Sequence, residues 1–337
     1  MAVPLNRRDL LKGALGVVAT WASSGVLSAQ QASGGVRRLT DQMVVVDGGG
    51  SNVLAFFTGE GFVLVDGGAP KSFDTIMASL GANAKVNTLI NTHHHVDQTG
   101  NNERFSTEGT QGTPLGRPAQ AGRRGSAGSS RRMATRPSGR TAIVAHKRTL
   151  EWMSADHWIQ ADDRYEKARP KNARPTETFL TTGSLKTGGE QIDYGYLTLA
   201  HTNGDIYVHF RNANVLAVGD VASPLRDPAL DYLTGAWIGG RVDSMDVLLT
   251  LANEQTRIVP AYGPVLSTAE FKAERDMMEE VRKRLFNQVR EGEGPRDMLE
   301  RGVLKGLART WNDPYKFLYD AAKGLWAHHD KLGPNVV

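Results

Sequence analysis

The chain has 337 residues, of which 40% are hydrophobic and 23% are charged, and its formal net charge at pH 7 is +4. A chain of this length can bury the core of one large domain. It contains no cysteine, which excludes disulfide bonds and thiolate metal ligands, so any bound metal ion must be held by nitrogen and oxygen atoms.

The N-terminus, residues 1–29, has the layout of an export signal. Its charged start contains the pair Arg7 and Arg8, a modestly apolar stretch follows, and small residues stand near Ser28 and Ala29. The arginine pair resembles a twin-arginine signal, and the apolar stretch is too short for a membrane span of about 20 residues. We therefore expect a periplasmic or otherwise exported protein without a membrane span. A retained N-terminal helix or membrane anchor is the alternative.

Polar side chains crowd directly after the β-rich run at residues 86–90, which we predict to be a buried strand. They are His93, His94, His95 and Asp97. Groups at the carboxyl end of a strand in an α/β sandwich face a cleft, and imidazole nitrogen with carboxylate oxygen is the ligand set that zinc prefers. The stretch therefore predicts a metal site, against the alternative of a histidine-rich surface turn.

A basic stretch separates these histidines from the next expected strand, at residues 141–145. Residues 109–140 contain seven arginines and no acidic residue, and residues 1–29 carry a net charge of +2, so the rest of the chain carries −5. Its Gly, Ser, Arg and Pro composition predicts a disordered loop, inserted at about residues 108–140. The folded body is then mildly acidic, and we expect no nucleic-acid partner. The loop is either a tolerated insertion or a site for an anionic partner, such as a membrane surface or an acidic polymer.

Residues 147–168, which follow this strand, have a helix-like pattern of apolar residues that includes Trp152 and Trp158. His146 follows the strand, and we expect it to be a hydrogen-bonded residue at the start of the helix rather than a group that approaches the cleft.

Further polar residues follow later apolar runs. His201 comes after the run at residues 196–200 and begins the segment His-Thr-Asn-Gly-Asp, Asp220 ends the run at residues 214–219, and Tyr262 follows Pro260 and Ala261. Short β-rich runs that alternate with helical ones indicate an α/β architecture. Helical spacing of apolar residues predicts helices at about residues 242–253, 268–291, 296–308 and 314–329.

A segment rich in glycine and aromatic residues, at 231–240, is expected to form a loop over the cleft. Its Tyr232 and Trp237 would line a substrate pocket or, as the alternative, pack beneath the next helix.

Taken together, these motifs resemble the metallo-β-lactamase-fold hydrolase superfamily. Its hallmark is H-x-H-x-D-H, followed by a separate His, a bridging Asp and a last His in a G-H-G-P context. The strand at residues 61–68, which carries Asp66 near its end, fits the first motif of that family, and the A-H-T-x-G-D segment around His201 resembles the glyoxalase-II-like and cyclase-like branches. The resemblance implies a single domain over residues 36–330, built as a four-layer αββα sandwich of two mixed β-sheets flanked by helices.

The resemblance also implies which residues hold metal. His93, His95 and His201 would form the first site, Asp220 would bridge, and Asp97 would serve a second site. Three neutral imidazoles leave one open position on zinc, where the pKa of a bound water falls to about 7. Asp97 would orient or deprotonate that water.

Two positions depart from the family pattern, because Gln98 and Tyr262 stand where histidines are expected. An amide oxygen is a poor zinc ligand, and a phenol with a pKa near 10 stays protonated. We therefore expect one zinc ion and a second site that is weak or empty. Tyr262 would instead donate a hydrogen bond to a developing oxyanion.

The leading hypothesis is an exported metal-dependent hydrolase in which a metal-bound hydroxide attacks the carbonyl of a small ester, thioester, lactone or lactam. One alternative is a non-catalytic or degenerate-site periplasmic accessory or binding protein. Another is a mononuclear iron sulfur dioxygenase, since His93, His201 and Asp220 form the two-histidine, one-carboxylate set that non-haem iron uses.

Overall fold

The computed structural model describes residues 35–109, 140–159 and 163–329. The export signal predicted at residues 1–29 lies outside these ranges, as do residues 110–139 of the predicted basic insertion. Among the described residues, no helix has both the length and the apolar character needed to cross a membrane.

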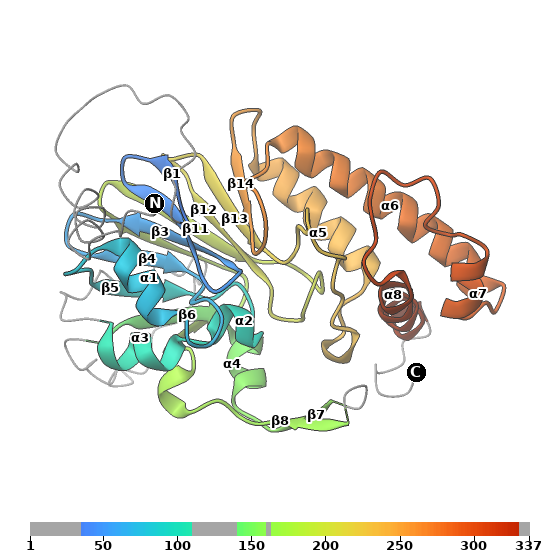
Figure 1. Cartoon of the computed structure of the whole chain (residues 1–337), viewed down its shortest axis with the longest axis horizontal. Helices are drawn as coiled ribbons and strands as arrows, with labels where there is room; N and C mark the ends of the chain where they lie inside the picture. Colours follow the sequence, from blue (N-terminus) through green and yellow to red (C-terminus); the bar gives the residue numbers. More distant parts are fainter. Residues whose placement is uncertain (1–34, 110–139, 160–162, 330–337) are drawn as a thin grey trace, which may run out of the picture.

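A seven-stranded mixed sheet forms the first half of the molecule (Figure 1). In order across the sheet, its strands are β1 (Val36–Thr40), β2 (Met43–Asp47), β3 (Asn52–Phe57), β4 (Phe62–Val65), β5 (Val86–Ile90), β6 (Ala142–His146) and β9 (Glu177–Phe179). The first four strands pair antiparallel, and β4, β5, β6 and β9 pair parallel. The carboxyl ends of the parallel strands therefore meet at one edge, where the histidine stretch follows β5.

A five-stranded sheet forms the second half. Its strands are β10 (Thr182–Thr187), β11 (Glu190–Tyr196), β12 (Ile206–Phe210), β13 (Val215–Gly219) and β14 (Arg257–Pro260). Only the last pair, β13 and β14, is parallel. The strand predicted at residues 196–200 is not formed, because β11 ends at Tyr196 and Leu199 has a positive φ of 53°. His201 thus follows an irregular segment rather than a strand.

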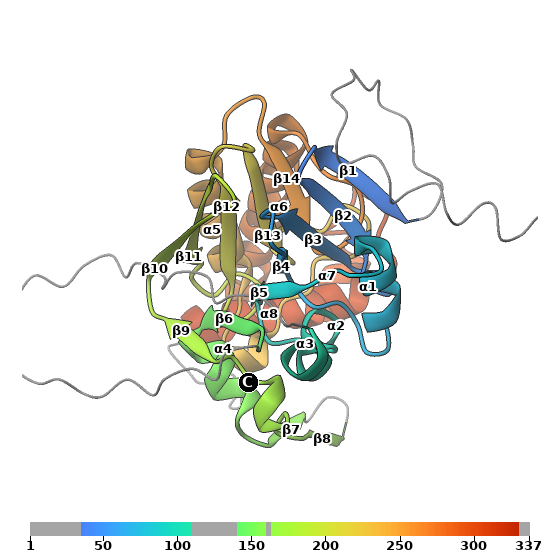
Figure 2. The ribbon, with the colours of Figure 1, turned by 90° about the vertical axis from the view of Figure 1, so that its left-hand side faces the viewer.

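Helices cover the outer faces of both sheets (Figure 2). On the first sheet lie α1 (Phe73–Leu80) and α3 (Asn102–Glu108), with the short α2 (Val96–Thr99) and α4 (Lys147–Met153) at its carboxyl edge; on the second lie α5 (Ile238–Leu251) and α6 (Thr268–Arg290). Helix α8 (Pro314–His329) packs on α5 and α6, farther from the sheet, and α7 (Pro295–Glu300) packs on α8 (Figure 1). Of the four helices predicted towards the C-terminus, three occupy nearly the predicted ranges. The helix predicted at residues 296–308 ends at Glu300, because Gly302 with a φ of 70° follows and breaks the turn.

Three apolar clusters separate four layers. One cluster joins the first sheet to α1 and α3, a second fills the space between the sheets, and a third joins β13 and β14 to α5, α6 and α8. Strand β2 shows how the sequence encodes this arrangement: Val44 and Val46 face the helices, while Met43 and Val45 face the other sheet. A strand buried on both faces is hydrophobic throughout. The predicted four-layer αββα sandwich is confirmed.

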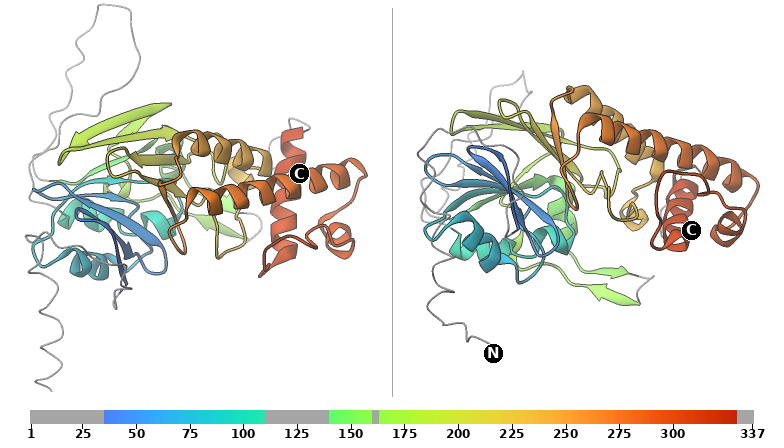
Figure 3. Two further views of the ribbon diagram at one scale, coloured as in Figure 1. Left: turned by 90° about the horizontal axis from the view of Figure 1, so that it is seen from above. Right: turned by 45° about the horizontal axis from the view of Figure 1, so that its top comes forward.

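The segment after α4 corrects the helix predicted for residues 147–168. The helix ends at Met153, and a two-stranded hairpin of β7 (His157–Ile159) and β8 (Arg164–Glu166) projects from the body (Figure 3). Asp156 closes the base of the hairpin by accepting a 2.9 Å hydrogen bond from the backbone N–H of Ala168. His146 lies at the start of α4 as predicted, where its Nδ1 accepts a hydrogen bond from the Arg148 backbone.

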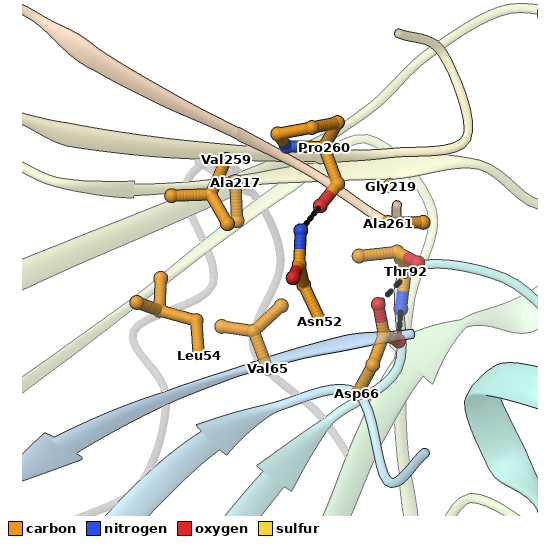
Figure 4. Close-up of a pocket in the computed structure, with 10 residues that line it drawn as sticks. All are labelled: Asn52, Leu54, Val65, Asp66, Thr92, Ala217, Gly219, Val259, Pro260 and Ala261. Atoms are coloured by element: carbon orange, nitrogen blue, oxygen red, sulfur yellow. Dashed lines mark hydrogen bonds between the residues drawn. The ribbon is translucent and has the colours of Figure 1, made fainter. Parts of the chain in front are cut away.

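A narrow cavity lies between the two sheets (Figure 4). The side chain of Asn52 extends across it and donates a 2.8 Å hydrogen bond to the Pro260 carbonyl. Apolar residues of β3, β4, β13 and β14 form most of the wall, Asp66 and Thr92 stand at one end, and no histidine lines it. This cavity belongs to the junction of the sheets and ends at the residues that support the histidine stretch.

Candidate metal centre

The structure brings three histidines from distant parts of the chain to one point. His93 and His95 lie between β5 and α2, and His201 follows β11. One ring nitrogen of each lies within 4.8 Å of those of the other two. The three rings meet nearly perpendicular to one another, with centroids 4.7 to 4.9 Å apart. The three-histidine set predicted from the sequence is thus assembled.

His93 is oriented by the residue before it. Its Nδ1 lies 3.0 Å from the hydroxyl oxygen of Thr92, and this hydroxyl donates to the carboxylate of Asp66 at 2.8 Å. Because the Thr92 hydroxyl already donates its hydrogen to Asp66, its oxygen accepts a hydrogen bond from Nδ1 of His93. The imidazole proton of His93 is therefore on Nδ1. Nε2 of His93 is buried and has no hydrogen-bond partner among the described residues, so its lone pair is free to bind an ion.

His201 is oriented by two backbone contacts. Its Nδ1 donates to the carbonyl of Ala229 at 2.8 Å, which leaves Nε2 with the lone pair. The buried carboxylate of Asp205 accepts hydrogen bonds from the backbone N–H groups of His201 and Thr202, at 2.6 and 2.8 Å. Asp205 therefore fixes the turn that carries the histidine, which gives the last residue of the A-H-T-x-G-D segment a structural role.

His95 is oriented by Asp231, a residue that the sequence did not single out. Nε2 of His95 lies 3.2 Å from Oδ2 of Asp231, and its Nδ1 faces Nε2 of His201 at 2.9 Å. Burial lowers the pKa of His95, but the hydrogen bond and the charge of Asp231 outweigh it and raise the pKa to about 9. Carboxylates that hold the far nitrogen of a ligand histidine fix its tautomer and increase its basicity.

The three histidines fit a single metal ion. Nδ1 of His95 and Nε2 of His201 are 2.9 Å apart at this centre. When His95 is protonated, as its raised pKa favours, its Nδ1 donates a hydrogen bond to Nε2 of His201. When His95 is neutral and donates from Nε2 to Asp231, both of these nitrogens present lone pairs, and a bound cation would take the place of the shared proton. Zinc and iron both accept this nitrogen set.

Asp220 adds a carboxylate to the same centre. Its Oδ2 lies 3.6 Å from Nε2 of His93 and 3.7 Å from Nε2 of His201. Gly219, with a φ of 56°, turns the chain here, and a Cβ at that position would meet the hydroxyl of Thr92 at 2.8 Å. Burial, and then the neighbouring charge of Asp97, raise the pKa of Asp220 to about 7. A bound cation would keep this carboxylate ionised, as its predicted bridging role requires.

Asp97 has two partners other than a metal. The hydroxyl of Tyr262 donates to its Oδ2, and a guanidinium nitrogen of Arg226 lies 3.9 Å from the same oxygen. The Arg226 guanidinium also stacks on the Tyr262 ring, 3.3 Å from its centroid. Burial and the hydrogen bond to Asp97 raise the pKa of Tyr262 well above its usual value. The phenol therefore stays protonated and donates its hydrogen to Asp97. An oxyanion donor role, as predicted from the sequence, would require this bond to break.

Gln98, the other departure from the family pattern, is wholly buried on α2. Neither its amide oxygen nor its amide nitrogen has a hydrogen-bond partner among the described residues. No hydrogen bond among the described residues therefore accounts for a glutamine side chain at this position. That Gln98 cannot replace a histidine as a strong zinc ligand stays a prediction.

The remaining candidates have other contacts. His94 points to a second side of the cluster, where its ring packs 4.8 Å from Trp152 and its Nε2 lies 3.6 Å from Asp231. Tyr232 and Trp237 both face α8: the first ring lies 6.2 Å from that of Tyr319, and the second stacks on His328 at 3.7 Å. Both rings therefore pack, but on the last helix rather than beneath the next helix along the chain, which was the predicted alternative to a role in a substrate pocket.

Comparisons with known proteins agree with this architecture. A family model described as the metallo-beta-lactamase superfamily matches residues 46–263. A metallo-beta-lactamase from Pontibacter korlensis has 17% sequence identity and a TM-score of 0.51, over 72% of this chain and 98% of that one. The DIM-1 metallo-beta-lactamase has 15% identity and a TM-score of 0.50, over 72% and 96% of the two chains. A search of curated proteins finds no match.

A sec-alkyl sulfatase variant is similar over a larger part of this chain. The identity is 10% and the TM-score 0.57, and the alignment covers 89% of this chain and 50% of that one. At these identities the solved structures show a shared fold only. The family model spans more than half of the 337 residues and includes every residue assembled at the histidine cluster. The chain belongs to the metallo-beta-lactamase superfamily.

Proposed function

We propose that the protein is a hydrolase that uses one zinc ion to cleave a small carbonyl substrate, such as an ester, thioester, lactone or lactam. The observation that carries this proposal is the orientation of His93, His95 and His201. Each ring has its far nitrogen fixed by an outer partner and turns its other nitrogen to one centre. A packing role for these rings would not need three outer partners that set complementary tautomers.

In this proposal each residue around the centre has a separate role. A zinc ion held by the three histidines would polarise a carbonyl and lower the pKa of a bound water to about 7. Asp97 would orient the attacking water and accept its proton, since its charge acts on both Asp220 and His95 at the centre. Tyr262 would hold Asp97 in place through its hydrogen bond. Asp220 would stay ionised and keep the centre close to neutral.

A second candidate is oxidation by mononuclear iron. It is supported by the distances of 3.6 and 3.7 Å that place Asp220 beside His93 and His201, because two histidines and a carboxylate are the common ligand set of non-haem iron. This candidate predicts iron in the purified protein and consumption of oxygen.

Elemental analysis of protein purified without added metal or chelator tests the proposal. We expect about one zinc ion per chain, and hydrolysis of at least one member of a panel of esters, thioesters, lactones and lactams. Sulfate esters belong in the panel because a sulfatase shares the fold. About one iron per chain would favour oxidation instead. Less than about a tenth of a metal ion per chain, with no hydrolysis after zinc is added, would contradict the proposal and favour a non-catalytic accessory or binding protein.

We also propose that the protein is exported, on the strength of the Arg7 and Arg8 pair in the N-terminal segment. Replacing both arginines by lysine keeps the charge and removes the pair. We expect the variant to remain in the cytoplasmic fraction of cells that export the wild-type chain. Equal export of the two chains would contradict a twin-arginine signal.

An anionic surface or polymer is the partner that we propose for the arginines of residues 109–140.

A further inference from the structure

One short segment, residues 229–231, orients two of the three histidines. The carbonyl of Ala229 accepts from Nδ1 of His201 at 2.8 Å, and Oδ2 of Asp231 holds Nε2 of His95 at 3.2 Å. The backbone N–H of Asp231 also donates to the carbonyl of His201 at 2.9 Å. The segment lies between β13 and α5 and contains no strand or α-helix. A loop that sets two ligand tautomers must itself be held in place, because ligand geometry depends on the rigidity of such outer contacts.

The side chain of Arg241 in α5 holds this segment from behind. It is fully buried, with 0% of its surface exposed. Its Nη1 donates to the Ala229 carbonyl at 3.4 Å, and its Nη2 donates to the hydroxyl of Ser223 at 2.8 Å. The carboxylate of Glu274 on α6 lies 3.9 Å from Nη2 and accepts a 2.7 Å hydrogen bond from the Ser223 backbone. The guanidinium thus connects the segment after β13, the carbonyl that orients His201, and α6.

Stability alone is a weak reason for an arginine at this position. A buried charge is costly to desolvate, and replacing a buried ionic group by a well-packed apolar one is often neutral or stabilising. The pairing of Arg241 is also incomplete: its Nε has no hydrogen-bond partner among the described residues, and Glu274 contacts it only as an ion pair. A costly buried charge thus contacts the carbonyl that accepts the hydrogen bond from His201.

We propose that Arg241 is a positioning residue of the metal centre, which sets metal affinity by holding residues 229–231 against His201 and His95. The guanidinium and His201 both donate to the Ala229 carbonyl, so a rotation of this carbonyl would weaken both contacts. The planar guanidinium can hold Ser223 and Ala229 together, which the single ammonium of a lysine cannot do. This inference rests on the metal site of the proposed function.

Zinc affinity of the full-length chain, measured by competition with a chromophoric chelator, tests the inference. Arg241→Lys keeps the charge but removes the two guanidinium nitrogens that contact Ala229 and Ser223. We expect the zinc dissociation constant to rise about tenfold to a hundredfold, as for loss of an outer-shell partner. The visible absorption of the cobalt-substituted variant should shift, because the ring orientations change. Asp231→Asn, which alters the same segment at His95, is expected to produce a rise of similar size.

Arg257→Lys is the matched control. Arg257 is a partly buried arginine on β14 that also donates to backbone carbonyls, those of Leu39 and Ala213, and none of these residues touches the histidines. The control should lose thermal stability without a change in zinc affinity or in the cobalt spectrum. If Arg241→Lys folds and binds zinc within about twofold of the wild type, the inference is overturned. If the wild-type chain binds no zinc, the proposed function fails first, and the two failures are distinguishable.

Should Arg241→Lys not fold, Ser223→Ala provides the second test. It removes only the hydroxyl that holds Nη2 and leaves a smaller side chain in the same place. We expect a rise in the zinc dissociation constant in the same direction and a smaller shift of the cobalt spectrum. An unchanged affinity in this variant would also count against the inference.

Discussion

Replacing His95 by alanine is expected to abolish both metal binding and hydrolysis. The change removes the Nδ1 atom that faces His201 at 2.9 Å and leaves only two imidazoles, beside the carboxylate of Asp220, in place of the three that would hold tetrahedral zinc in the proposed site. It also leaves the carboxylate of Asp231 without its nearest imidazole. Loss of a ligand should weaken zinc binding well beyond the roughly 10- to 100-fold effect of outer-shell changes. Zinc content after dialysis and hydrolysis of the best panel substrate would measure the effect.

His209→Ala is the control for this change. His209 is a buried histidine on β12 and is not one of the three histidines whose ring nitrogens meet at the centre. It should lose some stability and keep its zinc. A His95→Ala variant that binds zinc and hydrolyses substrate like the wild type would contradict the three-histidine centre. A wild type that is as inactive as the variant would favour the non-catalytic alternative.

Replacing Asp97 by asparagine is expected to lower kcat by about 10²- to 10⁴-fold, the usual contribution of a positioned general base. The amide can still accept the hydrogen bond from Tyr262, so the local geometry should persist. It cannot take up the proton of the attacking water, and it leaves Arg226 without its ion pair. Because His93, His95 and His201 are unchanged, zinc content should remain at about one per chain.

The pattern of loss identifies the role of Asp97. Unchanged kcat would exclude it as the base, whereas zinc that is lost together with activity would make it a metal ligand. Asp193→Asn is a suitable control, because Asp193 is a partly buried carboxylate on β11 that pairs with Arg211 at 3.9 Å, outside the histidine cluster. It should retain both zinc and activity. Measuring metal content and kcat in the same preparations separates the two explanations.

Local sequence was sufficient for the parts of the site that are close together along the chain. The run at residues 86–90 forms β5, which is buried along its whole length, and the chain leaves the sheet at its edge where this strand ends. His93 and His95 follow within five residues, so their placement needs no information from elsewhere. The same reasoning located Asp220 at the end of β13. Reasoning from local sequence failed for the hairpin after α4. There the backbone N–H of Ala168 donates a hydrogen bond to Asp156 at the base of the hairpin, and this contact overrides the helical pattern.

Only the tertiary structure decided how these groups are oriented. The hydrogen-bond partners around the centre come from distant segments of the chain. Asp66 is 26 residues from Thr92, Asp231 is 136 residues from His95, and Tyr262 is 165 residues from Asp97. No periodicity or spacing marks Asp231, Arg226 or Arg241, since each is a single charged residue in a loop or a helix of mixed composition. The sequence motifs, through their resemblance to the superfamily, were sufficient to predict the four-layer fold and to propose the three histidines as ligands, while local burial patterns predicted the individual strands that precede them. Ring tautomers, the engagement of Tyr262 with Asp97 and the buried arginine depend on contacts between layers, which form only when the two sheets pack together.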